Sequence, residues 1–548
     1  MKKKMAGPKI LTCMGEYSTG QLKKDVLAGI LVAVVAFPLS VALAIASGMS
    51  PERGLYSAIV GGFLVSLLGG SKVNIGGVTA ATVMTVFTIV EAYGLTGLAV
   101  ASIMAGILLI LMGLLRFGVL LKYIPRTITL GFTAGIAMGI CSGQLKGFFG
   151  LDMGEVPVKV MDKFIAYSRV MNTVDIPTLG TALAAMAILI LLPRITSKIP
   201  NSLAAILVIT PVVKLLKLDV ATIRSVYGEL PSHFPEFTIP AVSWSLIEAL
   251  IPSAVTLAML IAIVSLLACV VTDGLTGERH DSNQELIAQG IANIFCGFFG
   301  AAPVAGAVAR ASGSVKRGGR TPAAGIVHSI VVLFILLFLI PLAGYIPIPV
   351  LSAVLIIVAY NMSSWREFVF MATHASKSDF AVLMVTFFSG VLVDLLFAVE
   401  MGVMLSAILF MRRMSDVTRV REWEYAGEDD PESLNRRRVP AHTVVYEIEG
   451  PVFFATVDEM MNITASAQTR VIILRMRSVP SIDITAMQDM EHFLNRCKNR
   501  HITLILSHVN GQPRDAMEKA GIAQMVGPEN FCKNIDAALQ RAEQIVSV

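Results

Sequence analysis

Charged side chains are scarce in this sequence, and the shortage decides the class of protein. Asp, Glu, Lys and Arg make up 15% of the 548 residues, whereas 55% are hydrophobic. A soluble domain carries about 25% charged residues, so the composition excludes an ordinary soluble protein. The last 135 residues nevertheless hold 34 of the 83 charged side chains. We therefore expect a membrane part followed by a soluble C-terminal domain.

The sequence also lacks the patterns of metal, disulfide and nucleic-acid proteins. Its six cysteines form no Cys-x-x-Cys pair, which favours apolar filler over a metal site or a disulfide framework. The net charge of +5 is small and spread along the chain, which argues against a nucleic-acid partner. The membrane part shows no nucleophile–base or metal-ligand spacing. We therefore expect neither an enzyme nor a bound cofactor.

Long apolar runs follow one another as far as residue 413. At about 20 residues a span, ten begin near residues 26, 54, 96, 125, 176, 202, 247, 322, 378 and 397. Shorter or glycine-broken segments lie near 75–92, 286–300, 303–315 and 349–361, which gives about fourteen spans. Basic residues flank both ends of this series (Lys2, Lys3, Lys4, Lys9, Arg412, Arg413, Arg419 and Arg421). This pattern predicts a multi-pass protein of the cell membrane with both termini in the cytoplasm.

The expected regions are a cytoplasmic segment (1–24), a transmembrane domain (25–414), a charged linker (415–440) and a small α/β domain (441–548). The α/β assignment rests on strand patterns that alternate with a helical one after residue 441. Within the membrane part, LYSAIVGGFLVSLLG (55–69) resembles LIAQGIANIFCGFFG (286–300), and a Gly/Ala-rich stretch follows each copy. Such matching halves favour a transporter built from repeats. The alternative is a chance likeness between two Gly/Ala-rich helices.

Arg310 is a fixed charge in the second Gly/Ala-rich stretch. An arginine at membrane depth is costly and normally faces a cavity or a partner, yet runs 26–51 and 322–365 contain no Asp or Glu. Helices that start inside the bilayer offer free N–H groups to an anion. Small residues would keep two such starts open (Thr79, Ala80, Ala81, Gly306 and Ala307). We hypothesise that the substrate supplies the missing negative charge; the alternative is snorkelling to the cytoplasmic surface.

Three stretches of sequence carry a family resemblance. They are ASGMSPERGLYSAIVGGFLVSLLGGS (46–71), TDGLTGERHDSNQELIAQGIANIFCGFFG (272–300) and GAVARASGSVKRGGRT (306–321). With them, the chain resembles the sulfate permease (SulP) family of anion transporters, and its C-terminal region resembles the STAS domain of that family.

The resemblance implies an α-helical membrane protein of fourteen spans in a seven-plus-seven inverted repeat, followed by a cytoplasmic STAS domain. It implies a homodimer in the lipid bilayer and elevator-like alternating access. It places the anion between the N-termini of the third and tenth spans, with Arg310 on the tenth. The expected neighbours of the anion are then Thr79, Ala80, Ala81, Gly306, Ala307 and, on the first span, Ser40.

The chain departs from the family pattern in its eighth span. Coupled relatives have an acidic residue at the position of Val264, and sodium-coupled bicarbonate members have a threonine at the position of Ala268. Neither side chain can supply an oxygen ligand to a cation. We therefore expect an exchanger or uniporter for sulfate, chloride, bicarbonate or a dicarboxylate. A channel-like anion conductor and a STAS-linked membrane sensor remain alternatives.

Three further features have competing interpretations. Thr485, in the loop SIDITAM (481–487), matches by resemblance a serine that is phosphorylated in stand-alone STAS relatives of bacterial stress signalling. It is either a regulatory hydroxyl or, as we favour, the cap of the next helix. A cytoplasmic partner of the STAS domain is a separate open alternative. A charged cluster resembles a catalytic site but fits a loop or helix start better (Glu278, Arg279, His280, Asp281 and Glu285). His328 and His374 are isolated, and no role is assigned to them.

Overall fold

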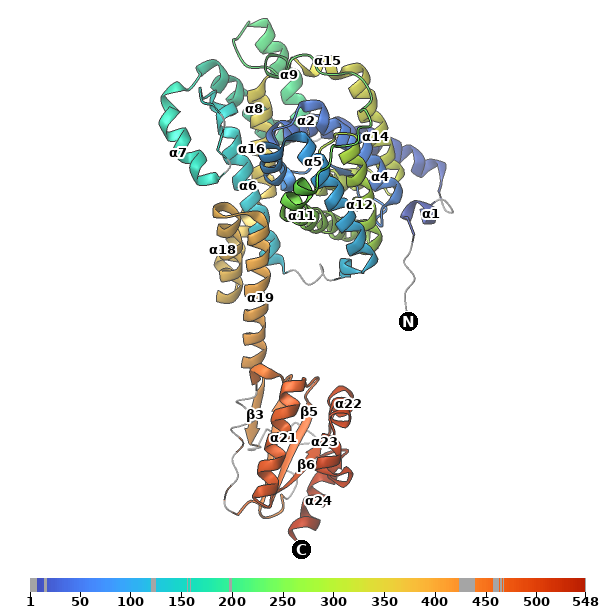
Figure 1. Cartoon of the computed structure of the whole chain (residues 1–548), viewed down its shortest axis with the longest axis vertical. Helices are drawn as coiled ribbons and strands as arrows, with labels where there is room; N and C mark the ends of the chain where they lie inside the picture. The colour runs from blue at the N-terminus through green and yellow to red at the C-terminus, as the bar shows by residue number, and fades with distance from the viewer. Residues whose placement is uncertain are drawn as a thin grey trace. The chain divides into compact units, whose positions relative to one another are not determined.

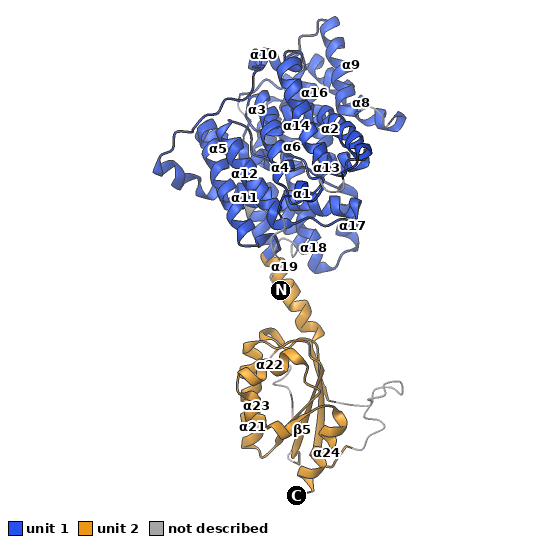
Figure 2. Ribbon diagram, turned by 90° about the vertical axis from the view of Figure 1, so that its right-hand side faces the viewer, with its two compact units in different colours: residues 1–403 blue, residues 404–548 orange. Residues whose placement is uncertain are grey.

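The computed structural model describes residues 7–13, 17–119, 125–154, 156–157, 159–196, 200–422, 439–456, 463, 466 and 468–547. The chain divides into two compact units, Met1–Val403 and Met404–Val548, coloured separately in Figure 2. Helix α19 (Leu395–Val417) contains the division between them.

The first unit is helical. Its first half contains α1 (Lys9–Cys13), α2 (Thr19–Ala46), α3 (Pro51–Tyr56), η2 (Ser57–Gly61), α4 (Gly62–Leu68), β1 (Gly76–Gly77), η3 (Ala80–Thr82), α5 (Val83–Leu114), α6 (Arg126–Phe149), α7 (Val160–Val170), η5 (Met171–Thr173), α8 (Ile176–Ile195) and α9 (Asn201–Leu215). Its second half contains α10 (Ile223–Tyr227), α11 (Trp244–Thr276), α12 (Ser282–Phe298), β2 (Ala305–Gly306), α13 (Val308–Lys316), α14 (Ala323–Phe334), η6 (Ile335–Leu339), α15 (Ile340–Ala343), α16 (Ile348–Met362), α17 (Trp365–His374), α18 (Lys377–Leu392) and α19.

The helices agree with the expected spans. Among the described residues, seven helices are long and apolar enough to cross a membrane, and every expected segment coincides with helical residues. Helix α5 contains two expected segments, because Gly94 interrupts it with a φ of 66°. Glycine tolerates this left-handed backbone, in which a Cβ would be strained.

Side-chain caps explain where several of these helices begin. Ser18 accepts a hydrogen bond from the backbone N–H of Gln21 (3.1 Å), and Ser243 accepts one from that of Leu246 (3.2 Å). Such caps precede α2, α8, α11, α12 and α18 (Ser18, Asp175, Ser243, Asp281 and Ser376). Each cap satisfies an N–H group that has no partner within the helix.

The first unit contains two groups of helices. The core group (α2–α5 and α11–α14) packs mainly within itself, as does the gate group (α6, α8, α9, α16 and α18). In Figure 1, α6, α7 and α8 lie to the left of α5 and α12. Helix α5 packs against α11 and α12 as α14 packs against α2 and α4, which agrees with an inverted repeat. At the α5–α12 contact, a Cβ on Gly106 would lie 2.6 Å from the carbonyl oxygen of Gly290.

The second unit is an α/β domain, as expected. Its sheet has the order β3 (Arg419–Glu422), β4 (Thr443–Glu449), β5 (Val471–Ser478), β6 (Thr503–Ser507) and β7 (Phe531–Cys532). Strand β3 is antiparallel to β4, and the other neighbours are parallel. One face packs against α21 (Ile484–Asn499), α22 (Gly511–Lys519) and α23 (Ile522–Val526), and the other against α24 (Ile535–Val546). Two 3₁₀ turns, η8 (Phe454–Thr456) and η9 (Pro528–Asn530), complete the domain.

The predicted linker, 415–440, includes regular structure at its start. Residues up to Val417 belong to α19, and Arg419–Glu422 form strand β3, paired with β4. The remaining residues 423–438 lie outside the described residues. The assignment of 419–422 to a linker is corrected, because an edge strand can expose charged side chains while its backbone pairs on one side.

Candidate functional site

The two short Gly/Ala-rich segments meet in the middle of the first unit. Strands β1 and β2 pair antiparallel, with Gly76 opposite Gly306 and Gly77 opposite Ala305. All four residues are buried. Within a bilayer, irregular backbone is tolerable only where it is buried in protein or lines a cavity, and this pairing satisfies part of it. Each strand leads into a helical start, β1 into η3 and α5, and β2 into α13.

Arg310 connects α13 to strand β1 and helix α2. Its side chain donates hydrogen bonds to the carbonyl oxygens of Gly76 (3.0 Å) and Val78 (3.3 Å) and to Oγ of Ser40 (3.0 Å). Arg310 is only 4% exposed, and no ion pair among the described residues includes it. Its Nε has no hydrogen-bond partner in the described part of the chain. The guanidinium is therefore buried and does not snorkel to the surface.

Gly77 allows this arrangement. A Cβ on Gly77 would overlap Nη1 of Arg310. No other residue would leave the guanidinium in its place against β1, so the glycine is needed for a close approach.

Two side chains hold strand β2. Asn293 of α12 accepts a hydrogen bond from the backbone N–H of Val304 and donates one to the carbonyl of the same residue, each at 2.8 Å. Ser265 of α11 accepts a hydrogen bond from the backbone N–H of Gly306 (2.8 Å). Sequence reasoning missed both residues, although Asn293 is a polar residue within the internal repeat and so gave a signal.

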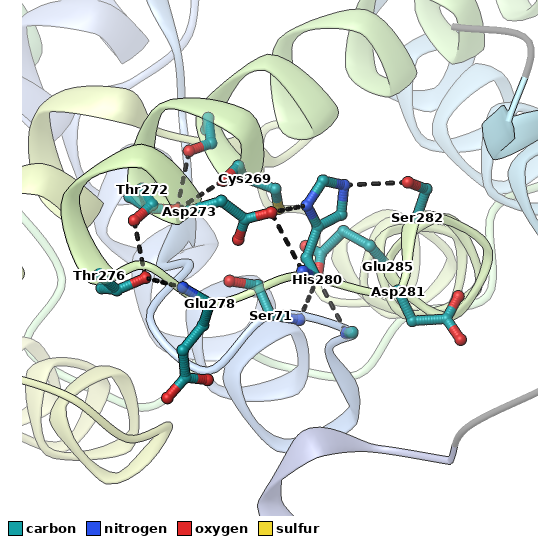
Figure 3. A network of polar contacts seen from close by, with 12 residues as sticks. Ser71, Cys269, Thr272, Asp273, Thr276, Glu278, His280, Asp281, Ser282 and Glu285 are labelled. Atoms are coloured by element: carbon teal, nitrogen blue, oxygen red, sulfur yellow. Dashed lines mark hydrogen bonds and ion pairs between the residues drawn. The ribbon is translucent and has the colours of Figure 1, made fainter. Parts of the chain in front are cut away.

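Glu285 holds the loop before strand β1. Its buried carboxylate accepts hydrogen bonds from the backbone N–H groups of Gly70 (2.9 Å) and Ser71 (3.2 Å). It also accepts bonds from the side-chain amides of Asn74 (2.7 Å) and Gln289 (3.0 Å). Figure 3 shows Glu285 beside Ser71. Glu285 therefore does more than add charge to a helix start, because it positions the segment that leads to the Arg310 site.

A polar network joins the end of α11 to the start of α12. Nδ1 of His280 lies 2.6 Å from Oδ2 of Asp273, and its Nε2 lies 2.9 Å from Oγ of Ser282 (Figure 3). The order of groups is that of a Ser–His–Asp triad. The cavity beside it has a volume of only about 30 Å³, which is room for about one water molecule. Since Asp281 caps α12, the geometry favours the expected helix start.

Two family models match the sequence. The model described as the sulfate permease family matches residues 22–386, and the STAS domain model matches residues 435–538. The chain belongs to the sulfate permease family.

Relatives match this chain over almost its full length. "Putative sulfate transporter YvdB" of Bacillus subtilis is 36% identical over 524 residues, 95% of this chain and 98% of that protein. "Bicarbonate transporter BicA" of Picosynechococcus is 28% identical over 539 residues, 95% of this chain and 94% of that protein.

Two solved structures share the fold of this chain. That of SLC26A9 has a TM-score of 0.87 at 20% identity and covers 98% of this chain and 92% of its own. The transmembrane domain of a cyanobacterial BicA has a TM-score of 0.62 at 28% identity and covers 71% of this chain and 98% of its own. The chain is thus a helical membrane transporter of this family with a C-terminal STAS domain.

The structure brings most of the predicted site residues of this chain together. Ser40 is fully buried and bonded to Arg310. Thr79 is buried, and its Oγ1 has no hydrogen-bond partner among the described residues. The remaining members lie at the helix starts or on α11: Ala80 and Ala81 in η3, Gly306 in β2, Ala307 as the N-cap of α13, and Val264 and Ala268 on either side of Ser265.

Thr485 lies apart from this site, in the STAS domain. The favoured interpretation of Thr485 as a helix cap is wrong. Asp483 is the N-cap of α21, where its carboxylate accepts a hydrogen bond from the backbone N–H of Ala486 (2.8 Å). Thr485 is the second residue of that helix and is half-buried. Asp and Thr both cap helices, so the sequence alone did not distinguish them.

Proposed function

We propose that this chain moves a small anion across the cell membrane, and that the anion binds between the start of η3–α5 and the start of α13. The observation that carries the proposal is the buried guanidinium of Arg310, which has no acidic partner among the described residues. A buried charge is costly unless an opposite charge compensates it. The transported anion supplies that charge when it binds.

Hydrogen-bond donors at the two helix starts support the same position. Thr79 has a buried hydroxyl without a partner among the described residues, and it lies next to η3. Small residues keep the starts open to a ligand (Ala80, Ala81, Gly306 and Ala307). Free N–H groups at such starts favour negative charge.

We propose the transport mode from the side chains of the eighth expected span, helix α11, and their inability to bind a cation. Val264 and Ala268 have no side-chain oxygen for a cation, so we propose exchange or uniport rather than sodium- or proton-coupled uptake. Movement of the core group against the gate group, in an elevator-like manner, would expose the site alternately on each side. The positive-inside rule places both termini in the cytoplasm, and the family resemblance supports a homodimer.

The identity of the anion is proposed only as a class. The names of two relatives mention sulfate and bicarbonate, and chloride and dicarboxylates also fit a site that contains one guanidinium.

A second proposal is that Thr485 is a regulatory hydroxyl in the STAS domain. A phosphoryl group at the start of α21 would be favourable there, because helix starts attract negative charge.

Flux measurements in proteoliposomes test the main proposal. Purified full-length protein would be supplied with labelled sulfate, chloride, bicarbonate or oxalate, with and without sodium and proton gradients. Arg310→Ala should lower transport at least tenfold. The matched control is Arg317→Ala at the end of the same helix, where Arg317 donates to the carbonyl of Gly313 (3.1 Å), and it should keep most of the flux.

Three results would contradict parts of this proposal. Full transport of every anion by Arg310→Ala would remove Arg310 from the site. A strong dependence of the wild-type flux on a sodium or proton gradient would refute the exchanger or uniporter mode. Unitary currents in planar bilayers would favour the channel-like conductor.

A further inference from the structure

The first unit also contains a cavity, which lies away from the residues that contact Arg310. Its volume is about 630 Å³, and it is bounded by the end of α2, the start of α5 and parts of α6, α7, α8 and α16. Val83, Met84 and Phe87 contribute the wall from the core group, and α6 contributes the wall from the gate group. The cavity therefore meets the same helix start, η3–α5, that the proposed anion site uses.

Several glycines of helix α6 line this cavity and belong to a regular series. Glycine occupies every fourth position (Gly131, Gly135, Gly139, Gly143 and Gly147). The first two lie against α18 and the last against α16, where their lack of a side chain allows close packing. A Cβ on Gly139 would face Sδ of Met84 at 3.7 Å, and one on Gly143 would face Nζ of Lys163 at 3.7 Å. These two glycines thus leave space in front of a lysine.

Lys163 is buried although it lies on a short amphipathic helix. Helix α7 turns Val160, Lys163 and Tyr167 inward, whereas Phe164 and Ile165 are 44% and 52% exposed. Lysine is among the residues least often buried without a partner, and here it replaces an apolar residue on the inner face. The hydroxyl of Tyr167 donates to the carbonyl of Ser142 (2.8 Å) and fixes this orientation.

Among the described residues, the ammonium of Lys163 has no strong partner. Lys163 is 4% exposed, and its closest hydrogen-bonding contact among the described residues is Sδ of Met84 at 3.9 Å. No ion pair in the described part of the chain includes it. Sulfur is a weak acceptor, so this contact does not compensate the desolvation of a charge.

None of the other charged groups that line the cavity in the described part of the chain pairs directly with Lys163. Asp175 caps α8 by accepting from the backbone N–H of Thr178 (3.0 Å). Asp219 is exposed, and Lys146 donates to the carbonyl of Gly154 (2.8 Å). The formal charges of the two described acids and two described lysines on this wall sum to zero. A singly charged anion disturbs this balance less than a doubly charged one.

We propose that Lys163 and this cavity form a second anion site, which binds a small, singly charged anion at the entrance to the Arg310 site. The inference rests on the proposed transport function. Gln144, Thr178 and Ser352 line the same cavity and can donate hydrogen bonds to the ligand. The contact between Lys163 and Met84 places the ammonium two residues after η3, so an ion released from that helix start would meet it.

The protonation behaviour of Lys163 agrees with this geometry. Helix α7 lies between the expected spans, and burial lowers the pKa of Lys163 to about 8. An anion beside the amine would favour its charged form and raise this pKa again. Binding and protonation of the amine should therefore strengthen each other.

Chemical labelling of the wild-type protein tests the site without relying on transport. Full-length protein in nanodiscs would be methylated with formaldehyde and a borane reductant at pH 8, in chloride or in gluconate at equal ionic strength. Mass spectrometry would follow Lys163 and, as a control, the exposed Lys377, which does not line the cavity. Chloride should slow the methylation of Lys163 at least threefold in a saturable manner, sulfate should slow it less, and Lys377 should not respond.

The outcomes separate this inference from the transport proposal. If chloride leaves the rate at Lys163 unchanged, or slows Lys163 and Lys377 in parallel, the site does not exist. Protection of Lys163 in a protein that transports no anion would support the site and refute the transport function. In active protein, Lys163→Met should raise the half-saturating chloride concentration several-fold without changing the maximal rate, and Lys163→Arg should restore it.

Discussion

Replacing Lys163 by methionine measures how much its buried ammonium destabilises the folded protein. Burial lowers the pKa of Lys163 from its ordinary value of 10.5 to about 8. Since one pKa unit corresponds to about 1.4 kcal/mol, the charged side chain reduces the free energy of unfolding by about 3 kcal/mol. Methionine has a similar length and no charge, so Lys163→Met should be more stable than the wild type near pH 7.

The direction of the shift fixes how this difference depends on pH. The unfolded chain binds the proton of Lys163 more tightly, so it holds more protons than the folded chain between about pH 8 and 10.5. The wild type therefore gains stability from this group as the pH rises through that interval. The advantage of Lys163→Met should be largest below pH 8 and should vanish above 10.5, apart from differences in packing.

Thermal unfolding of full-length protein in detergent measures this effect. Gluconate would be the only added anion, so that no small ion compensates the ammonium. At pH 7, Lys163→Met should unfold several degrees above the wild type, and at pH 10 the difference should shrink markedly. Lys146→Met is the matched control and should not raise the unfolding temperature at pH 7, because Lys146 has a hydrogen bond to the carbonyl of Gly154. Equal stabilisation at both pH values, or none at pH 7, would refute the assignment of a costly buried charge to Lys163.

Three other substitutions test the contacts that build the fold and the site. Asn293→Ala removes both hydrogen bonds to Val304, so it should lower thermal stability by about 1–3 kcal/mol and weaken anion flux, whereas Asn293→Asp should recover only part. Gly106→Leu forces a side chain against the carbonyl of Gly290 and should prevent folding, so that the peak of folded protein is lost on size-exclusion chromatography. Asp483→Ala removes the cap of α21 and should cost the STAS domain about 1 kcal/mol, measured by denaturant unfolding of the full chain.

The fold was largely predictable because a bilayer imposes a simple rule on sequence. Each span must be apolar over about 20 residues, so the starts of the long helices follow from the apolar runs. The break at Gly94 was also predictable in position, because the expected segments 75–92 and 96 onward leave it between them, close to the charged Glu91. The start of the STAS sheet was missed, because the charged residues of β3 look like a linker until their backbone pairing is known.

Part of the candidate site could be predicted from the sequence, namely the residue that differs most from its neighbours. Arg310 stands out because its neighbours in sequence are small and uncharged. Ser40, one of its partners, was among the predicted residues. The other two partners are the backbone carbonyls of Gly76 and Val78, and a residue type does not reveal which carbonyl a side chain will contact. The positions of Asn293 and Ser265 depend on how α11 and α12 approach β2, which is a property of tertiary packing and not of local pattern.

Lys163 shows the limit of the same principle. It shares the physical condition of Arg310, a buried cation without an acidic partner among the described residues. Its sequence neighbours include Asp162, Lys159 and Arg169, so a lysine there looks like an ordinary surface residue. Only the orientation of α7, which turns Lys163 inward and Phe164 outward, reveals the cost of the charge. Burial without an acidic partner among the described residues, rather than surrounding composition, is therefore the property on which both residues are proposed as anion ligands.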